Sequence, residues 1–123
     1  MDLKGVRILL VEDSWHLGVA MKNLLQVLGA DVAGPAATAA EAERLLLEQP
    51  PDVALVDFHL RDDERADALI DRLHDRGVRV VVISGYSVVP LAPEKVVAIL
   101  KKPVTQSQLL ATLRPLVAKK QAS

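Results

Sequence analysis

Four mainly apolar runs and one weaker run divide the chain. Runs without polar alternation, bounded by turn residues, predict strands that are buried on both faces, as in a parallel sheet. The clearest run is Val53–Val56, which follows Pro50-Pro51 and leads directly into Asp57. The others are Val6–Val11, Val78–Ile83, Val96–Leu100 and the short Ala30–Ala33, whose Asp31 suits an edge strand and which Gly34-Pro35 is predicted to end.

Between these runs the apolar residues recur every three or four positions, which predicts amphipathic helices. Capping boxes at Thr38–Glu41 and Thr105–Gln108 predict two helix starts. Pro115 is predicted to kink the last helix or end it early. Ser87–Lys95 holds two prolines and no clean period, so the fourth helix is expected to be short. The first helix begins near Trp15, and its predicted inward residues are Leu17, Ala20, Met21, Leu24 and Leu28.

The alternation of strand and helix, repeated five times, predicts an α/β fold with a parallel, doubly wound sheet and helices on both faces. Residues 1–123 are expected to form one domain. In a five-stranded sheet of the flavodoxin-like order 2-1-3-4-5, the first and third strands are neighbours. The ligand crevice then opens between their carboxyl ends.

Composition narrows the classes of function. Half of the residues are hydrophobic but only 2% are aromatic, so the core must be mostly Leu, Val, Ile and Ala. Fifteen basic residues against sixteen acidic ones give a net charge of −1, which indicates neither a nucleic-acid surface nor a membrane surface. The absence of Cys excludes disulfides and thiolate metal sites. Without a signal peptide or a membrane-length apolar run, a cytoplasmic protein is expected.

The predicted strand ends carry the candidate chemistry. Glu12-Asp13, Asp57, Ser84 and Lys102 each follow an apolar run, and the order 2-1-3-4-5 brings them to one edge of the sheet. Clustered carboxylates repel by about 4 kcal/mol per pair at the effective dielectric of a protein surface, so they need a cation. Mg²⁺ prefers such oxygen ligands. A carboxylate beside Mg²⁺, a lysine and a hydroxyl provides what an acyl phosphate requires.

In this order, Glu12-Asp13, Asp57, Ser84 and Lys102-Pro103 resemble the receiver domain of bacterial two-component response regulators. The resemblance covers essentially the whole chain. It implies a phosphorelay in which Asp57 accepts a phosphoryl group from a sensor histidine kinase or a histidine phosphotransfer protein. It also implies that the chain is not an enzyme but a phosphoacceptor that assists its own Mg²⁺-dependent phosphorylation and dephosphorylation.

The same resemblance implies roles for further residues. Asp13 and Asp57, with the backbone carbonyl of His59, would bind Mg²⁺, and Glu12 would assist through water. Ser84 would bond a phosphoryl oxygen, and Lys102 would pair with the phosphate. The peptide bond before Pro103 would be cis.

The resemblance also bears on how the signal leaves the domain. We expect no output domain after the last predicted helix. We therefore expect signalling by contact with an unknown downstream protein, from a monomer or a weak homodimer. A fragment of a hybrid kinase is the alternative.

Two features depart from the family pattern. The family's switch aromatic lies three residues before the lysine, where this chain has Ile99. The segment from Ser84 to Lys102 is also several residues shorter than usual. Both features concern the face that receivers use to signal. The sequence Ser84-Gly85-Tyr86 and the short fourth helix resemble a subgroup of stand-alone, chemotaxis-receiver-like proteins.

Other functions explain fewer residues. A flavodoxin-like cofactor binder needs a phosphate-binding loop after the first strand, and Glu12-Asp13-Ser14-Trp15 does not provide one. An aspartate-based phosphatase would carry two aspartates two positions apart after the first strand, and this chain does not. The remaining alternative is a receiver-fold interaction module that acts without phosphorylation. Taken singly, the Lys102-Pro103 pair fits a plain strand exit, and Glu12-Asp13 fits charges at a helix N-terminus.

Overall fold

The computed structural model describes residues 3–60, 65–85 and 93–122, with side chains as far as Leu116. Strands and helices alternate along the chain, and one 3₁₀ turn, η2, lies between the last two strands. The strands are β1 (Arg7–Val11), β2 (Asp31–Ala36), β3 (Val53–Asp57), β4 (Arg79–Ser84) and β5 (Ala98–Lys101). The helical segments are α1 (Trp15–Val27), α2 (Ala39–Glu48), α3 (Asp67–Asp75), η2 (Pro93–Lys95) and α4 (Gln106–Ala122).

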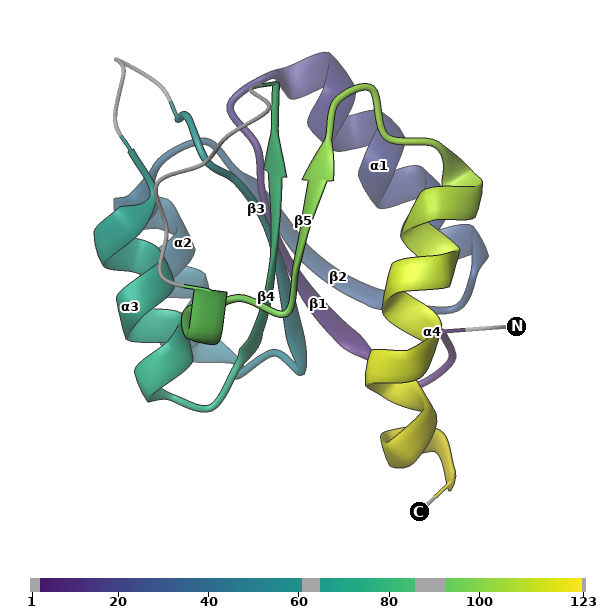
Figure 1. Cartoon of the computed structure of the whole chain (residues 1–123). Helices are drawn as coiled ribbons and strands as arrows, with labels where there is room; N and C mark the ends of the chain where they lie inside the picture. Colours follow the sequence, from purple (N-terminus) through teal and green to yellow (C-terminus); the bar gives the residue numbers. More distant parts are fainter. Residues whose placement is uncertain (1–2, 61–64, 86–92, 123) are drawn as a thin grey trace.

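The strands form one parallel sheet in the order β2-β1-β3-β4-β5 (Figure 1). This confirms the predicted doubly wound sheet and its order. β3 lies in the centre, and β1 and β4 pair with it on either side. The carboxyl ends of β1 and β3 are therefore neighbours at the point where the strand order reverses, which is where ligands bind in sheets of this kind.

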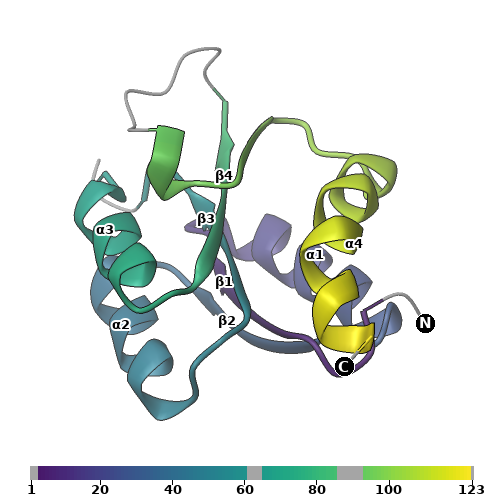
Figure 2. The same cartoon turned by 60° about the horizontal axis from the view of Figure 1, so that its bottom comes forward.

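Helices cover both faces of the sheet, as Figures 1 and 2 show. α1 and α4 cover one face and contribute Met21, Leu25, Leu109 and Leu113 to its core. α2 and α3 cover the other face, where Leu46, Leu69, Ile70 and Leu73 are buried. Successive residues of β3 point alternately into these two cores, and all five residues of β3 are buried. The unbroken apolar run Val53–Val56 reflects this burial on both faces. The equally apolar Val96–Leu100 does not, because β5 lies at an edge of the sheet and Ile99 is exposed.

The second strand differs from the prediction. Gly34-Pro35 was expected to end it, but β2 continues through both residues to Ala36. Proline is compatible with a strand at the edge of a sheet, because its missing N–H can face away from the ladder. The predicted edge position of this strand is confirmed.

Two helices also differ from the prediction. The buried residues of α1 are Gly18, Met21 and Leu25, whereas Leu17 and Ala20 are exposed. The sequence pattern gave no weight to Gly18, so the predicted inward face is rotated from the observed one. α4 was expected to kink or end early at Pro115, but it continues past this residue to Ala122. Burial of Leu109 and Leu113 favours this helix despite the proline.

The connection between β4 and β5 is the segment in which a short fourth helix was expected. Residues 86–92 lie outside the described part of the chain, and the described part of this connection holds η2. The Lys95 ammonium pairs with Asp71 of α3 at 2.6 Å, so this turn is tied to the α3 side of the sheet. None of the helices within the described ranges has the length and apolarity that crossing a bilayer requires.

The burial of α3 gives a first testable expectation. Ile70 is fully buried, so Ile70→Val should lower the free energy of unfolding by about 0.5–1.5 kcal/mol and Ile70→Ala by about 2–5 kcal/mol. Leu47, on α2, is 65% exposed, and Leu47→Ala should change stability by less than about 0.5 kcal/mol. Urea unfolding followed by circular dichroism measures both. Equal losses for Leu47→Ala and Ile70→Ala would contradict the packing described above.

Candidate functional site

The buried polar residues of the described part are Glu12, Asp57 and Ser84, and all three lie at the carboxyl edge of the sheet. Glu12 directly follows β1, Asp57 ends β3 and Ser84 ends β4. Lys102 directly follows β5. Burying polar groups is costly unless they have partners, so their concentration at one edge points to a functional role. The structure thus brings together the residues that the sequence placed at separate strand ends.

Lys102 connects these strand ends. Its Nζ donates to Asp57 Oδ2 at 3.0 Å and lies 3.4 Å from Glu12 Oε1. Its backbone N–H donates to the carbonyl oxygen of Ser84 at 2.8 Å. The other carboxylate oxygen of Asp57, Oδ1, accepts the backbone N–H of His59 at 3.2 Å. Both oxygens of Asp57 are therefore held in fixed directions.

Glu12, Asp13 and Asp57 form an acidic cluster in which one oxygen from each carboxylate lies within 4.8 Å of the others. Glu12 Oε2 is buried and has no hydrogen-bond partner among the described residues. Three carboxylates this close together, one of which has an unsatisfied oxygen, fit a divalent cation such as Mg²⁺ better than a second ammonium group. The donor set therefore suits the metal that the sequence predicted.

The electrostatics of the cluster follow from burial and from like charge. Burial raises the pKa of Glu12, the nearby charge of Asp57 raises it further, and Lys102 only partly opposes this, so the pKa reaches about 7. For Lys102, burial acts to lower the pKa of its ammonium. The hydrogen bond and charge of Asp57, together with Glu12, outweigh burial and raise this pKa. The site thus favours a protonated lysine and holds a proton on Glu12 up to neutral pH.

The remaining predicted residues are near these groups or on β5. His59 lies two residues past β3, with its ring edge-on to buried Phe58 at 5.0 Å between centroids. The Lys102–Pro103 peptide bond is cis. Ile99 is paired with Val82 in the sheet and is 46% exposed. It therefore presents an aliphatic surface at the position of the family's switch aromatic.

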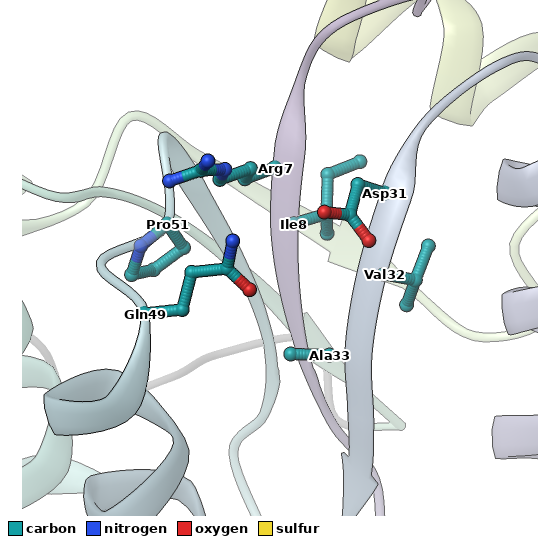
Figure 3. A pocket seen from close by; sticks show the side chains of 7 residues that line it. All are labelled: Arg7, Ile8, Asp31, Val32, Ala33, Gln49 and Pro51. Carbon is teal, nitrogen blue, oxygen red and sulfur yellow. The ribbon is translucent and has the colours of Figure 1, made fainter.

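Among the hollows lined by described residues, two lie at opposite ends of the strands. The one beside the site has a volume of about 340 Å³ and is lined by Leu17, Met21, Ile83, Lys102, Pro103 and Val104. The other, of about 120 Å³, lies at the amino ends of β1 and β2 (Figure 3). It is far from the acidic cluster, and its lining is Arg7, Ile8, Asp31, Val32, Ala33, Gln49 and Pro51. Only the first hollow adjoins the candidate chemistry.

Sequence patterns do not identify two residues that support the site. Gly18 of α1 packs against Pro35 of β2, and both lie behind Glu12. A glycine within a helix is less favourable than an alanine and usually has a packing reason. That was the available signal, but a helical period scored on apolar residues alone does not detect it.

Comparison with known proteins finds a related regulator and related domains. No protein-family model matches the chain. The alginate biosynthesis transcriptional regulatory protein AlgB of Pseudomonas putida is 34% identical over 116 residues, which is 89% of this chain. A CheY-like response regulator receiver domain from Methylobacillus flagellatus is 25% identical with a TM-score of 0.75, covering 90% of this chain and 98% of that one. In sequence and in fold, this chain is similar to response regulator receiver domains.

Other similarities define the fold alone or concern only part of a longer protein. A variant of the anti-anti-sigma factor PhyR from Bartonella quintana is 21% identical with a TM-score of 0.82, covering 99% of this chain and 53% of that one. The chain spans only 26% of the length of AlgB. Receiver domains are generally phosphoacceptors rather than enzymes, they bind Mg²⁺ at an acidic pocket, and they interact with kinases or phosphotransfer proteins.

The pKa of Glu12 predicts a pH dependence of stability. In EDTA, the contribution of Glu12 to the free energy of unfolding should fall as the pH rises from about 4.5 to about 7. In this window the native carboxyl keeps a proton that the unfolded chain has released, so rising pH favours the unfolded chain. Outside the window, the two states bind this proton equally.

Urea unfolding of wild type and Glu12→Gln at several pH values measures this contribution, because the glutamine cannot titrate. The difference between the two proteins should change within the window and stay constant above it. Glu48→Gln controls for the loss of one carboxyl, since the Glu48 side chain is 58% exposed. A difference that stays constant from pH 4.5 to 7 would show that Glu12 is not perturbed.

Proposed function

We propose that residues 1–123 form one receiver domain that accepts a phosphoryl group on Asp57, with Mg²⁺, and signals by protein contact. The donor is a sensor histidine kinase or a histidine phosphotransfer protein of the cytoplasm. The observation that carries this proposal is the position of Asp57. It is a buried carboxylate within the acidic cluster, and the Lys102 ammonium lies 3.0 Å from one of its oxygens.

The transfer forms one bond and breaks one bond. A carboxylate oxygen of Asp57 attacks the phosphorus of a phosphohistidine, the P–N bond breaks, and its electron pair stays on the imidazole nitrogen of the donor. The product is an aspartyl phosphate. Bound at Glu12, Asp13, Asp57 and the His59 carbonyl, Mg²⁺ would neutralise negative charge on the phosphoryl oxygens.

The protein contributes position and charge. The backbone N–H of His59 orients the Asp57 carboxylate. The Lys102 ammonium pairs with this carboxylate and can pair with the phosphoryl group after transfer. Ser84, at the end of the neighbouring strand, offers a hydroxyl to a phosphoryl oxygen. The chain thereby assists its own phosphorylation. Attack of a water molecule on the same phosphorus would break the O–P bond to Asp57, release inorganic phosphate and restore the carboxylate.

A second candidate function is signalling by binding alone, without phosphorylation. The similarity in fold to the anti-anti-sigma factor PhyR fits this candidate. The apolar hollow beside Lys102 would suit either function, because it offers a partner contact surface. The acidic cluster and its lysine favour the phosphoacceptor, because binding alone needs neither.

Mass spectrometry after incubation with Mg²⁺ and acetyl phosphate tests the phosphoacceptor. We expect one base-labile phosphoryl group per chain, located at Asp57, because that carboxylate makes the shorter contact with Lys102, at 3.0 Å against 3.4 Å for Glu12. The mass shift should disappear in EDTA and in Asp57→Ala. Asp52→Ala is a matched control, since Asp52 lies near the opposite end of β3 and caps the backbone of Arg7.

The outcomes separate the two candidates. A full mass shift that persists in Asp57→Ala would refute the assignment of the acceptor. No shift in the wild type, with either a small phosphodonor or a phosphohistidine protein, would favour the binding module.

The route by which the signal leaves the site gives a further expectation. Ile99 has no ring to reorient, so movement of Ser84 toward the phosphate must be transmitted by its own backbone and the segment to Lys95. Residues 86–92 of this segment lie outside the described part. Adding Mg²⁺ and beryllofluoride should shift amide NMR signals most between Ser84 and Lys95.

Ser84→Ala should suppress these shifts while leaving Asp57 able to accept phosphate. Ile99→Ala is the comparison variant, because it shortens the side chain at the switch position without touching the hydroxyl. Largest shifts in the Thr38–Gln49 helix, or an Ile99→Ala effect as complete as that of Ser84→Ala, would show that the signal takes another route.

A further inference from the structure

An extra residue in β2 lies directly beside the acidic cluster. Leu9 pairs with Ala33 and Val11 with Ala36, so one residue of β1 faces two residues of β2, Gly34 and Pro35. Gly34 has a φ of 106°, and a Cβ at this position would lie 2.4 Å from the carbonyl oxygen of Leu10. This β-bulge therefore depends on glycine. Bulges next to functional sites often re-aim a neighbouring side chain.

The bulge gives Glu12 a backbone partner. The N–H of Glu12, one residue past the end of β1, donates to the carbonyl oxygen of Ala36 at 2.9 Å. Residues of a strand alternate in the direction of their hydrogen-bonding groups. The extra residue in β2 therefore brings Ala36 into phase with Glu12. The carboxylate with the unpartnered oxygen is thus fixed by β2 as well as by β1.

α1 packs on the other side of the bulge. A Cβ on Gly18 would lie 2.7 Å from Cβ and 2.9 Å from Cγ of Pro35, both atoms of a rigid ring. One turn further along α1, the ammonium of Lys22 donates to the carbonyl oxygen of Gly34 at 2.9 Å. α1 thus contacts the bulge at two points. The first of these contacts requires a residue without a side chain.

The same helix positions the other carboxylate. Asp13 precedes Ser14, the N-cap of α1, and the Gly18 N–H donates to the Ser14 carbonyl oxygen at 2.8 Å. The Cβ of Glu12 lies 3.7 Å from the point that a Gly18 Cβ would occupy. Pushing α1 away from Pro35 would therefore shift the start of the helix, with Asp13, and loosen the packing behind Glu12.

We propose that Gly18 and Pro35 are positioning residues for the metal site. Their contact lets α1 close onto the β2 bulge and sets where Glu12 and Asp13 present their carboxylates. This inference rests on the proposed function, because it assigns a structural basis to Mg²⁺ binding at that site. Neither residue touches the reacting atoms.

The test compares Gly18→Ala, Pro35→Gly and the double variant in Mg²⁺ titrations followed by the amide NMR signals of Asp13 and His59. Gly18→Ala should weaken the apparent affinity by about 10-fold or more, as for other groups that orient metal ligands. The double variant should recover most of the loss, because Pro35→Gly removes both ring atoms that the new methyl group would meet. Ile70→Val and Ile70→Ala, on the opposite face of the sheet, should lower stability but leave the affinity within about twofold of wild type.

A second measurement, in EDTA, does not depend on the metal. The amide proton of Glu12 should shift upfield in Gly18→Ala as its bond to Ala36 lengthens, and it should return in the double variant. If the wild type does not respond to Mg²⁺, the proposed metal site is wrong, and this shift alone decides whether Gly18 positions Glu12. A folded Gly18→Ala with an unchanged Glu12 signal and unchanged affinity would overturn the inference. Equal loss of affinity in the Ile70 variants would do the same.

Discussion

The pairing of one ammonium group with two buried carboxylates is the interaction on which the site depends. Lys102 enters from the end of β5, Glu12 from β1 and Asp57 from β3, so the pairing exists only when the three strands lie in register. Breaking a buried pair leaves an uncompensated charge, which is strongly destabilising. The two hydrophobic layers are therefore a requirement for the chemistry, because they hold the strand ends in place against the repulsion of the carboxylates.

One lysine does not balance the cluster. Glu12, Asp13 and Asp57 carry more negative charge than Lys102 can neutralise. Burial raises the pKa of Glu12, and the negative charge of Asp57 raises it further. A proton or a divalent cation can supply the missing positive charge. The domain therefore has two ways to satisfy the same electrostatic need, and the solution decides between them through its pH and its Mg²⁺ concentration.

Much of this could be predicted from the sequence, because burial on both faces leaves a strong local signal. The runs ending at Val11, Asp57 and Ser84 mark strands, and the parallel sheet brings their ends together without further information. The features that were missed depend on tertiary contacts. Gly34-Pro35 is predicted to end the second strand, although Asp31 indicates an edge position, because the bulge that carries β2 through Pro35 forms only in register with β1. The predicted inward face of α1 differs from the observed one because Gly18 packs closely through its small size. A pattern of hydrophobic residues does not register a glycine.

Burial of β3 on both faces has a consequence for how this domain opens. Each of its five residues is buried, and the strand has a hydrogen-bonded neighbour on either side. Backbone groups in such a strand exchange their hydrogens with solvent mainly through unfolding of the whole domain, whereas edges and surface turns exchange through local opening. The proposed phosphoacceptor is the last residue of this strand. Phosphorylation would therefore modify the part of the domain that opens least readily. The conformational response would occur in the surrounding elements, whose local opening requires less free energy.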